Sequence, residues 1–292
     1  MYNRPAMPCE QCHDSQWVSE VIDGVARARR CDCWRQAIVE HQLAHARIPR
    51  RYQHCELVNF EQAVDSLREA HRRARAFIDA FPAVDRGLLL HGRHGVGKTH
   101  LAVAVLKEIV RIKGGRGYFY ETRELLKLVR DTYASSGDAT EMDVLRPVLD
   151  ADILVLDDLG AEKTSEWVQE TLGLVVNTRY SERRPTVFTT NLDDSADSGD
   201  VNSMLVRVGA RIRSRLFEMC HWVHMDGFDI REVGSANPTP ADIARYNERS
   251  PLSDRNQRPG AFPEKPRGMA RATLKSRGTS DVNWSGGKGG SG

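Results

Sequence analysis

Two spacings of apolar residues alternate along the middle of the chain. Short apolar runs predict buried strands at residues 87–91 (GLLLH), 117–120, 152–156 (DILVL), 186–190 and 221–225. Apolar residues at helical spacing predict helices at residues 61–81, 98–113, 123–134, 166–180 and 204–218. Strands that alternate with helices form a mostly parallel sheet covered on both faces, so the pattern predicts an α/β fold.

The two ends of the chain differ from this middle part. Residues 1–46 are rich in Cys, His and Arg, and Pro49 breaks any helix in the segment that follows. Residues 233–292 are rich in Pro, Gly, Ser and Arg and contain too few large apolar residues to offset the entropy cost of ordering. We therefore expect a small domain at 1–46, a linker at 47–60, an α/β domain at 61–232 and a disordered basic tail at 233–292.

Composition limits the classes of protein to consider. The chain has 292 residues, of which 40% are hydrophobic and 28% charged, as in soluble globular proteins. A formal net charge of +2 gives no overall basic coat, so any contact with nucleic acid must be local. No apolar stretch approaches the roughly 18 residues of a membrane helix, and the start does not resemble a signal peptide. We expect a cytoplasmic protein with no membrane partner.

A glycine-rich segment joins the first apolar strand to the next helix. Residues 92–99 read GRHGVGKT, the full P-loop pattern in the strand–helix context that it requires, which disfavours an ordinary glycine turn. Glycines allow backbone N–H groups to surround phosphate oxygens at the helix N-terminus. Lys98 is expected to contact the β- and γ-phosphates of ATP, and Thr99 to bind Mg²⁺. The predicted ATP site comprises Gly92, Arg93, His94, Gly95, Val96, Gly97, Lys98, Thr99 and His100.

Two acidic residues, Asp157 and Asp158, follow the DILVL strand. Asp157 is expected to hold the Mg²⁺ ion, and Asp158 to orient or deprotonate the attacking water. Many related ATPases have glutamate at the second place, and the shorter aspartate predicts slow or partner-stimulated hydrolysis. Asn191 closes the next strand and could sense the γ-phosphate, although a simple strand-end turn is the alternative.

Arginines cluster near the end of the α/β region. A spacing of four predicts that Arg207, Arg211 and Arg215 share one face of a helix, and Arg231 follows the last strand. An arginine that reaches a γ-phosphate stabilises charge in the transition state. The alternative is a solvated basic face.

Four of the six cysteines lie close together near the start of the chain. Clustered cysteines in an intracellular chain indicate metal binding more often than disulfides. Residues 16–31 are expected to form two short strands around an Asp-Gly turn, and His13 could replace one thiolate. The alternative is free thiols in an unfolded arm; Cys55 and Cys220 lie apart and are expected to be packing residues. The predicted tetrahedral Zn²⁺ site consists of Cys9, Cys12, Cys31 and Cys33.

Taken in order, these motifs resemble the AAA+ helicase loaders of the DnaC/DnaI type and the related IstB transposition helpers. The resemblance covers about residues 48–231. It rests on IPRRY (48–52), GVGKTHLAVAVL (95–106), DILVLDDLGAEKTSEW (152–167), VVNTRYSERRPTVFTTNL (175–192), GARIRSRL (209–216) and GFDIR (227–231). The resemblance implies an AAA+ three-layer sandwich.

The resemblance also implies roles for matching residues. Asn191 matches sensor 1, and Arg231 matches sensor 2. Arg211 matches the arginine finger that reaches the ATP of a neighbouring subunit, which implies self-association or a mixed AAA+ assembly. Arg215 is the rival for this role, because the loop at 193–204 is unusually long and acidic.

Two further matches concern DNA. Arg130 and Tyr133 match positions where loaders contact single-stranded DNA, and their chemistry fits phosphate contact and base stacking. An ordinary helix with an exposed arginine and a packed tyrosine is the equal alternative.

Three functions remain open from the sequence. The resemblance favours an ATPase that loads a hexameric replicative DNA helicase onto single-stranded DNA, since a cysteine-bearing N-terminal domain is similar to that of DnaI-type loaders. An IstB-like ATPase helper of DNA transposition is the alternative. A zinc-ribbon adaptor that binds nucleotide only as a structural ligand is the third, and the complete set of expected catalytic residues argues against it.

Overall fold

The computed structural model describes residues 9–134, 140–194, 200 and 203–233. Five parallel strands form its larger sheet in the order β4-β5-β6-β3-β7. The strands are β3 (Gly87–Gly92), β4 (Gly117–Glu121), β5 (Ile153–Asp157), β6 (Thr186–Thr190) and β7 (Cys220–Met225). Each predicted strand is confirmed to within one residue at either end. β3, β5 and β6 are buried along their whole length, which explains why they read as continuous apolar runs.

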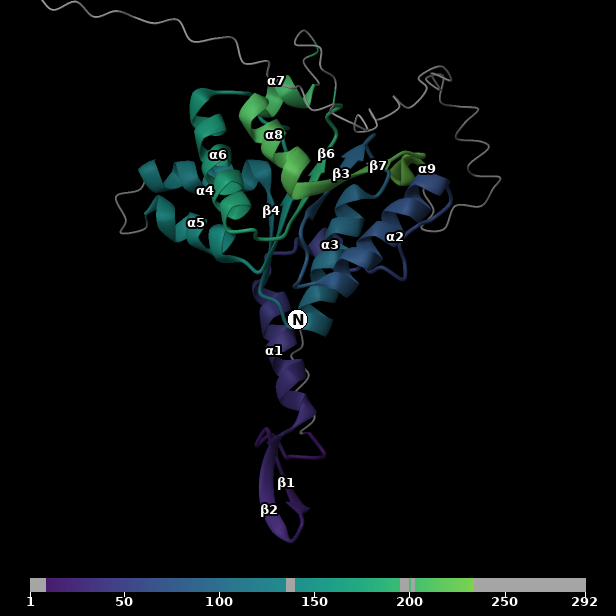
Figure 1. Cartoon of the computed structure of the whole chain (residues 1–292), viewed down its shortest axis with the longest axis vertical. Coiled ribbons are helices and arrows are strands. Elements are labelled where there is room, and N and C mark those ends of the chain that lie inside the picture. The colour runs from purple at the N-terminus through teal and green to yellow at the C-terminus, as the bar shows by residue number, and fades with distance from the viewer. Residues whose placement is uncertain (1–8, 135–139, 195–199, 201–202, 234–292) are drawn as a thin grey trace, which may run out of the picture. The chain divides into compact units, whose positions relative to one another are not determined.

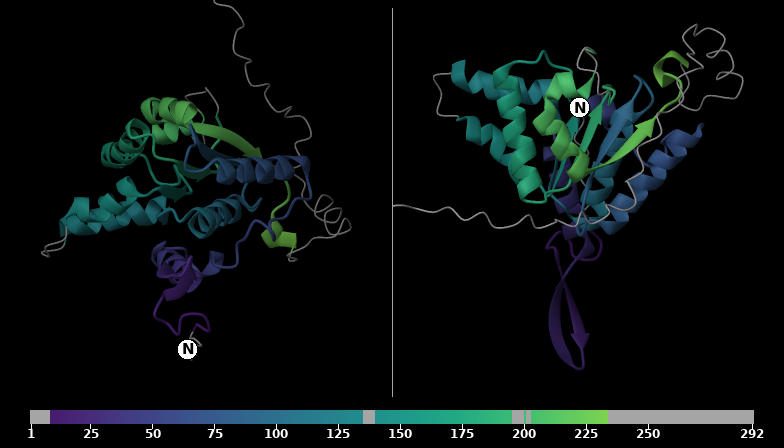
Figure 2. Two further views of the ribbon diagram at one scale, coloured as in Figure 1. Left: turned by 60° about the horizontal axis from the view of Figure 1, so that its bottom comes forward. Right: turned by 45° about the horizontal axis from the view of Figure 1, so that its top comes forward.

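Helices cover both faces of this sheet and enclose a separate apolar core on each side (Figure 1). One face carries α2 (Asp65–Ala80) and α3 (Lys98–Glu108), which continues into the π-helical turn η2 (Ile109–Lys113). The opposite face carries α4 (Thr122–Ala134), α5 (Glu141–Asp150), α6 (Glu166–Ser181), α7 (Met204–Val208) and α8 (Ala210–Met219). The two further views in Figure 2 show the same layers. The predicted three-layer α/β sandwich is confirmed.

The predicted helix at residues 204–218 is two helices in the structure. Gly209 separates α7 from α8 with φ +86°, a conformation that a side chain rarely adopts. The prediction that Arg207 shares a helical face with Arg211 and Arg215 is therefore wrong. Arg207 instead donates hydrogen bonds to the carbonyl oxygens of Gly160 (2.8 Å) and Ala161 (3.0 Å), where it fixes the loop after β5.

The cysteine-rich segment contains the predicted hairpin, β1 (Trp17–Ile22) paired antiparallel with β2 (Val25–Arg30). Asp23 and Gly24 form its turn with φ values of 52° and 75°, as a two-residue hairpin turn requires. Two further helices follow, α1 (Asp32–His45) and the 3-10 turn η1 (Arg50–Tyr52).

The segment after the hairpin contacts the α/β region. α1 contacts η2 and β4, and Phe119 N–H donates to the Ala46 carbonyl oxygen at 2.8 Å. In the segment expected to be a linker, Cys55, Leu57 and Phe60 are buried in the core beneath α2 and α3.

The last described element is α9 (Ile230–Val233). The tail predicted at 233–292 lies outside the described residues, apart from its first residue. Within the described part of the chain, no helix is both long enough and apolar enough to cross a membrane.

Candidate functional site

The glycine-rich loop lies between β3 and α3 and has a tightly constrained backbone. Gly92, Gly95 and Gly97 have φ values of 139°, 73° and 97°, which glycine adopts without steric cost. A Cβ atom at Gly95 would lie 1.9 Å from Oδ1 of Asp229, so only glycine fits beneath the residues that lead into α9. Ile230 N–H also donates to the Gly95 carbonyl oxygen at 3.2 Å. The GFDIR segment is thereby held against the phosphate loop.

Lys98 begins α3 and is almost completely buried, with 7% of its surface exposed. Its ammonium group donates to the carbonyl oxygens of Gly92 (2.8 Å) and Arg93 (2.6 Å). Burial lowers the pKa of Lys98 to about 8, against the opposing attraction of Asp158 and Asp157. The loop therefore holds a poorly solvated cation, which a phosphate anion can stabilise.

Asp157 is held at the end of β5 by two hydroxyl groups. Thr99 Oγ1 donates to Oδ1 of Asp157 at 2.9 Å, and Thr189 Oγ1 donates to the same oxygen at 2.6 Å. Burial raises the pKa of Asp157, and these two hydrogen bonds oppose that effect. A hydroxyl and a carboxylate in contact are oxygen ligands of the kind that Mg²⁺ prefers, so Thr99 and Asp157 fit the predicted metal role.

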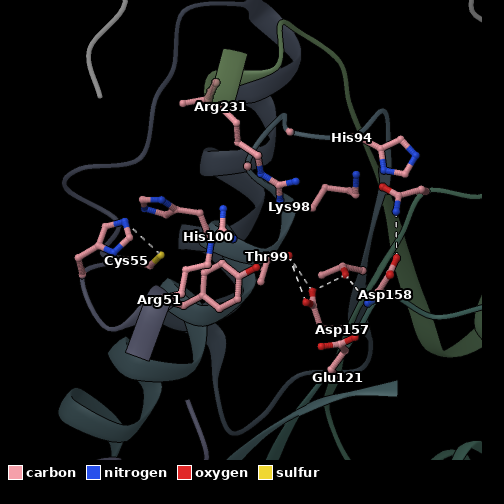
Figure 3. A pocket seen from close by; sticks show the side chains of 17 residues that line it. Arg51, Cys55, His94, Lys98, Thr99, His100, Glu121, Asp157, Asp158 and Arg231 are labelled. Atoms are coloured by element: carbon pink, nitrogen blue, oxygen red, sulfur yellow. Dashed lines mark hydrogen bonds between the residues drawn. The ribbon is translucent and has the colours of Figure 1, made fainter. Parts of the chain in front are cut away.

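Asp158 and Asn191 form a second pair beside it. Asn191 Nδ2 donates to Oδ1 of Asp158 at 2.9 Å, and the Asp158 N–H donates to Thr189 Oγ1 at 2.9 Å (Figure 3). Asp158 has φ 56°, in the left-handed region that aspartate tolerates better than most residues. The Asp158 carboxylate is therefore fixed next to the predicted Mg²⁺ ligands and can accept a proton or a hydrogen bond from water.

These groups line one pocket of about 390 Å³. The predicted residues that line it are His94, Gly95, Gly97, Lys98, Thr99, His100, Asp157, Asp158, Asn191 and Arg231. The pocket is not lined by Gly92, Arg93 or Val96. Gly92 and Arg93 supply the carbonyl oxygens that Lys98 contacts. Val96 is buried. The structure thus brings together residues from the start, middle and end of the α/β region.

Seven lining residues were not predicted as site residues from the sequence: Arg51, Tyr52, His54, Cys55, Glu121, Thr189 and Ile230. Arg51 and Tyr52 belong to the IPRRY motif, which carried the resemblance but no role, because about 40 residues separate it from the loop. Glu121 ends β4 and Thr189 lies next to the end of β6, so strand-end polar residues were the available signal.

The candidate fingers lie outside this pocket. Arg211 is exposed on α8, and Arg215 Nη1 donates to its carbonyl oxygen at 3.3 Å. The Arg215 guanidinium also lies 5.9 Å from the ring centroid of Tyr180. Neither arginine lines the pocket of its own chain, which is compatible with action on a neighbouring subunit.

The candidate DNA contacts lie on α4. The guanidinium of Arg130 lies 4.8 Å from the ring centroid of Trp167 on α6. Tyr133 is 60% exposed, and its hydroxyl donates to Glu141 Oε2 at 2.5 Å. An accessible ring beside an arginine fits base stacking and phosphate contact. The sequence had not indicated the neighbouring Trp167.

The four predicted cysteine ligands meet at the base of the hairpin. Cys9 Sγ lies 3.7 Å from Cys31 Sγ, and Cys12 Sγ lies 3.3 Å from Cys33 Sγ; all four sulfur atoms are within 4.8 Å of one another. Sulfurs about 2.3 Å from a tetrahedral Zn²⁺ ion would be about 3.8 Å apart, so the cluster fits this metal. Hydrogen bonds from backbone N–H groups, chiefly that of Cys12, lower the pKa of Cys9 to about 7. His13 is exposed and does not belong to the cluster.

Comparison with known proteins gives concordant matches. A family model described as IstB-like ATP binding protein matches residues 38–233. The replicative helicase loader DnaC of Escherichia coli strain K12 is 25% identical over 165 residues, which are 56% of this chain and 64% of that protein. The replicative helicase loader DnaI of Bacillus subtilis strain 168 is 35% identical over 107 residues, which are 36% of this chain and 33% of that protein. The chain thus spans less than two thirds of the length of these relatives.

Comparison with solved structures also finds a helicase loader. A crystal structure of the DnaC helicase loader is 33% identical with a TM-score of 0.54, and the match covers 61% of this chain and 100% of that one. AMPPCP-bound DnaA from Aquifex aeolicus has a TM-score of 0.51 at 19% identity, covering 62% of this chain and 51% of that one, which is a likeness of fold alone. The resemblance to DnaC/DnaI-type loaders and the AAA+ fold class are confirmed.

Proposed function

Because the chain belongs to the IstB-like ATP binding protein family, we propose that it is an ATP-dependent loader of the replicative DNA helicase. In this proposal it places a hexameric helicase on single-stranded DNA during the initiation or restart of replication, in the cytoplasm. The observation that carries the proposal is the match to a DnaC helicase loader structure over 100% of that chain at 33% identity. The pocket that the predicted nucleotide-binding residues line supports the part of the proposal that concerns ATP.

The proposed reaction is hydrolysis of ATP to ADP and phosphate. Lys98 and the N–H groups of the glycine-rich loop bind the β- and γ-phosphates. Thr99 and Asp157 hold Mg²⁺, which neutralises charge on the phosphate oxygens when bound. Asp158, positioned by the hydrogen bond from Asn191, orients the attacking water and accepts its proton.

Two arginines have separate proposed roles. Arg231 lines the pocket of its own chain and is placed to contact phosphate there, as a sensor 2 residue. Arg211 lies outside that pocket and acts as a finger on the ATP of a neighbouring subunit. Hydrolysis then requires self-association or a mixed AAA+ assembly, which links the nucleotide state to assembly.

The remaining surfaces are proposed to bind the partners. The zinc-binding segment contacts the helicase, since residues 1–60 contain 8 Lys or Arg against 7 Asp or Glu and have no strongly basic balance that would favour DNA. Arg130 and Tyr133 contact single-stranded DNA. The Trp167 ring supports this arrangement because the Arg130 guanidinium lies over it, 4.8 Å from the ring centroid.

Binding of the host's replicative helicase to the full-length chain tests this proposal. We expect the two purified proteins to co-elute in size-exclusion chromatography, and ATP to change the stability of the complex. No association at any nucleotide state would contradict the proposal. ATP-dependent filaments on double-stranded DNA without helicase binding would instead favour the transposition helper.

A further inference from the structure

A second group of potential metal ligands lies beside the phosphate loop. In the described part of the chain, two groups of side chains could hold a metal ion, and the one outside the four-cysteine cluster consists of His54, Cys55 and His100. One ligand atom from each residue lies within 4.8 Å of the other two, and Cys55 Sγ is 3.9 Å from His54 Nε2. All three residues line the nucleotide pocket.

Hydrogen bonds hold the loop that carries two of these ligands. Asn59 Oδ1 accepts from the Glu56 N–H at 2.9 Å, and Asn59 Nδ2 donates to the His54 carbonyl oxygen at 2.8 Å. Lys107 Nζ, from α3, donates to the Cys55 carbonyl oxygen at 3.0 Å. The backbone on either side of Cys55 is therefore fixed to α3, which places its thiol against His100. A positioned ligand set of this kind distinguishes a metal site from a chance cluster.

The protonation of His100 is set by its neighbours. His100 Nε2 lies 3.0 Å from the Glu56 carbonyl oxygen and 3.0 Å from Asn59 Oδ1. Both of these oxygens are acceptors, since Asn59 Oδ1 already receives the Glu56 N–H. Nε2 must therefore carry the proton, and the lone pair is left on Nδ1. A carbonyl oxygen that fixes the tautomer of a ligating histidine in this way is typical of metal sites.

We propose that His54, Cys55 and His100 bind a Zn²⁺ ion, or another transition-metal ion of similar preference, beside the nucleotide loop. Zn²⁺ binds both imidazole nitrogen and thiolate sulfur, and three protein ligands leave a fourth position open. Cys55 Sγ forms the metal–sulfur bond and releases its proton to solvent as the ion binds. The site is separate from the four-cysteine cluster, so the full chain binds a second ion.

The site predicts a regulatory effect, which rests on the proposed binding of ATP. Figure 3 shows Cys55 and His100 on one side of Thr99, with Asp157 and Asp158 on the other, inside the same pocket. An ion held by the three side chains fills part of the space next to the phosphate loop. Zn²⁺ and ATP therefore exclude one another.

Metal stoichiometry tests the site without reference to nucleotide. Full-length protein dialysed against buffered Zn²⁺ is expected to hold two ions per chain, and Cys55→Ser and His54→Ala to hold one. His221→Ala, which removes an exposed histidine on β7, is the control and is expected to hold two. Co²⁺ in place of the second ion should give a tetrahedral thiolate spectrum that Cys55→Ser lacks. One ion in the wild-type chain, or equal occupancy in wild type and Cys55→Ser, would overturn the site.

Measuring the affinity for ATP at a fixed concentration of free Zn²⁺ tests whether the two ligands exclude one another. At a free Zn²⁺ concentration ten times its dissociation constant, the wild-type chain should bind ATP about tenfold more weakly than without Zn²⁺. Cys55→Ser should show no such loss. Equal loss in both proteins would mean that Zn²⁺ acts on ATP itself, and would overturn the exclusion but not the metal site. Failure of wild type and variant to bind ATP even without Zn²⁺ would count against the proposed ATPase instead.

Discussion

Lys98 is the residue at which burial and function are most directly connected. Its pKa is lowered to about 8 because burial disfavours the ammonium form, while bound phosphate requires that form. The free site loses its proton as the pH rises through about 8. We predict that ATP affinity is constant below this pH and falls about tenfold per pH unit above it. Titration of a fluorescent ATP analogue at several pH values measures this.

Lys98→Arg is the matched control for this dependence. A guanidinium keeps its charge in this pH range, so the variant should bind more weakly at neutral pH but show a flat profile. The same alkaline loss in both proteins would show that another group titrates.

Asp158 is predicted to serve hydrolysis and not binding. Its carboxylate does not contact the loop lysine but is aligned by Asn191 Nδ2 at 2.9 Å. Asp158→Asn should lower the rate of ATP hydrolysis by about a hundredfold or more and change the dissociation constant of ATP only slightly. Single-turnover hydrolysis measures the rate. Asp152→Asn, at the opposite end of β5 and paired with Arg116, should retain activity; if Asp158→Asn retains it too, the assigned role is wrong.

At the scale of single residues, the sequence did not predict contacts between residues that lie far apart along the chain. Lys98, Thr99 and Asp157 were predictable because the first two begin the helix after a glycine-rich loop of known spacing and the third ends a strand. Tyr52 and Cys55 were not, since η1 and the residues after it line the same pocket as the loop and no local sequence pattern indicates that contact. Arg207 was assigned to the wrong face because one glycine interrupts the helix.

At the scale of elements, α8 carries the predicted contact between subunits. Arg211→Ala should lower ATP hydrolysis about a hundredfold, since a donor to transition-state charge is lost. A mixture of Arg211→Ala with Lys98→Ala should recover part of the activity, because each chain supplies what the other lacks at their interface. Recovery with Arg215→Ala in place of Arg211→Ala would transfer the role to Arg215. Failure of both mixtures would exclude a finger that acts in trans.

We expect the hairpin to be the element most dependent on metal. None of the described side chains on β1 or β2 is buried, so apolar packing within the hairpin contributes little stability. Removing Zn²⁺ with a strong chelator should unfold residues 9–31 while the α/β region keeps its melting temperature. Trypsin cleavage after Arg27 and Arg29 measures this and should become fast only in the chelated protein. Unchanged protection would mean that the hairpin folds without metal.

Strands were easier to predict than helices in this chain. β5 and β6 are buried on both faces, and their apolar runs mark their bounds. α5 was missed because Pro147 lies inside it, although Thr140 and Asp143 form a capping box at its start. α1 was missed because no side chain on it is buried, so it has no apolar stripe to detect.

At the scale of the whole molecule, the proposed function requires three parts: a metal-binding hairpin that contacts the helicase, an ATP site between subunits, and a surface on α4 that contacts DNA. Each part has a structural basis in this chain, but the function requires that they act together. In the proposed function, the nucleotide site controls the other two parts, because a finger contact from a neighbouring chain would make hydrolysis depend on assembly.

The most direct test is the amount of replicative helicase loaded on closed circular single-stranded DNA. A closed circle admits a ring-shaped helicase only if the ring is opened or assembled around it. With wild-type chain and ATP, we predict a large increase in DNA-bound helicase over helicase alone, and little increase with Lys98→Ala. Helicase that loads equally well without the chain, or with Lys98→Ala, would contradict the account of an ATP-dependent loader.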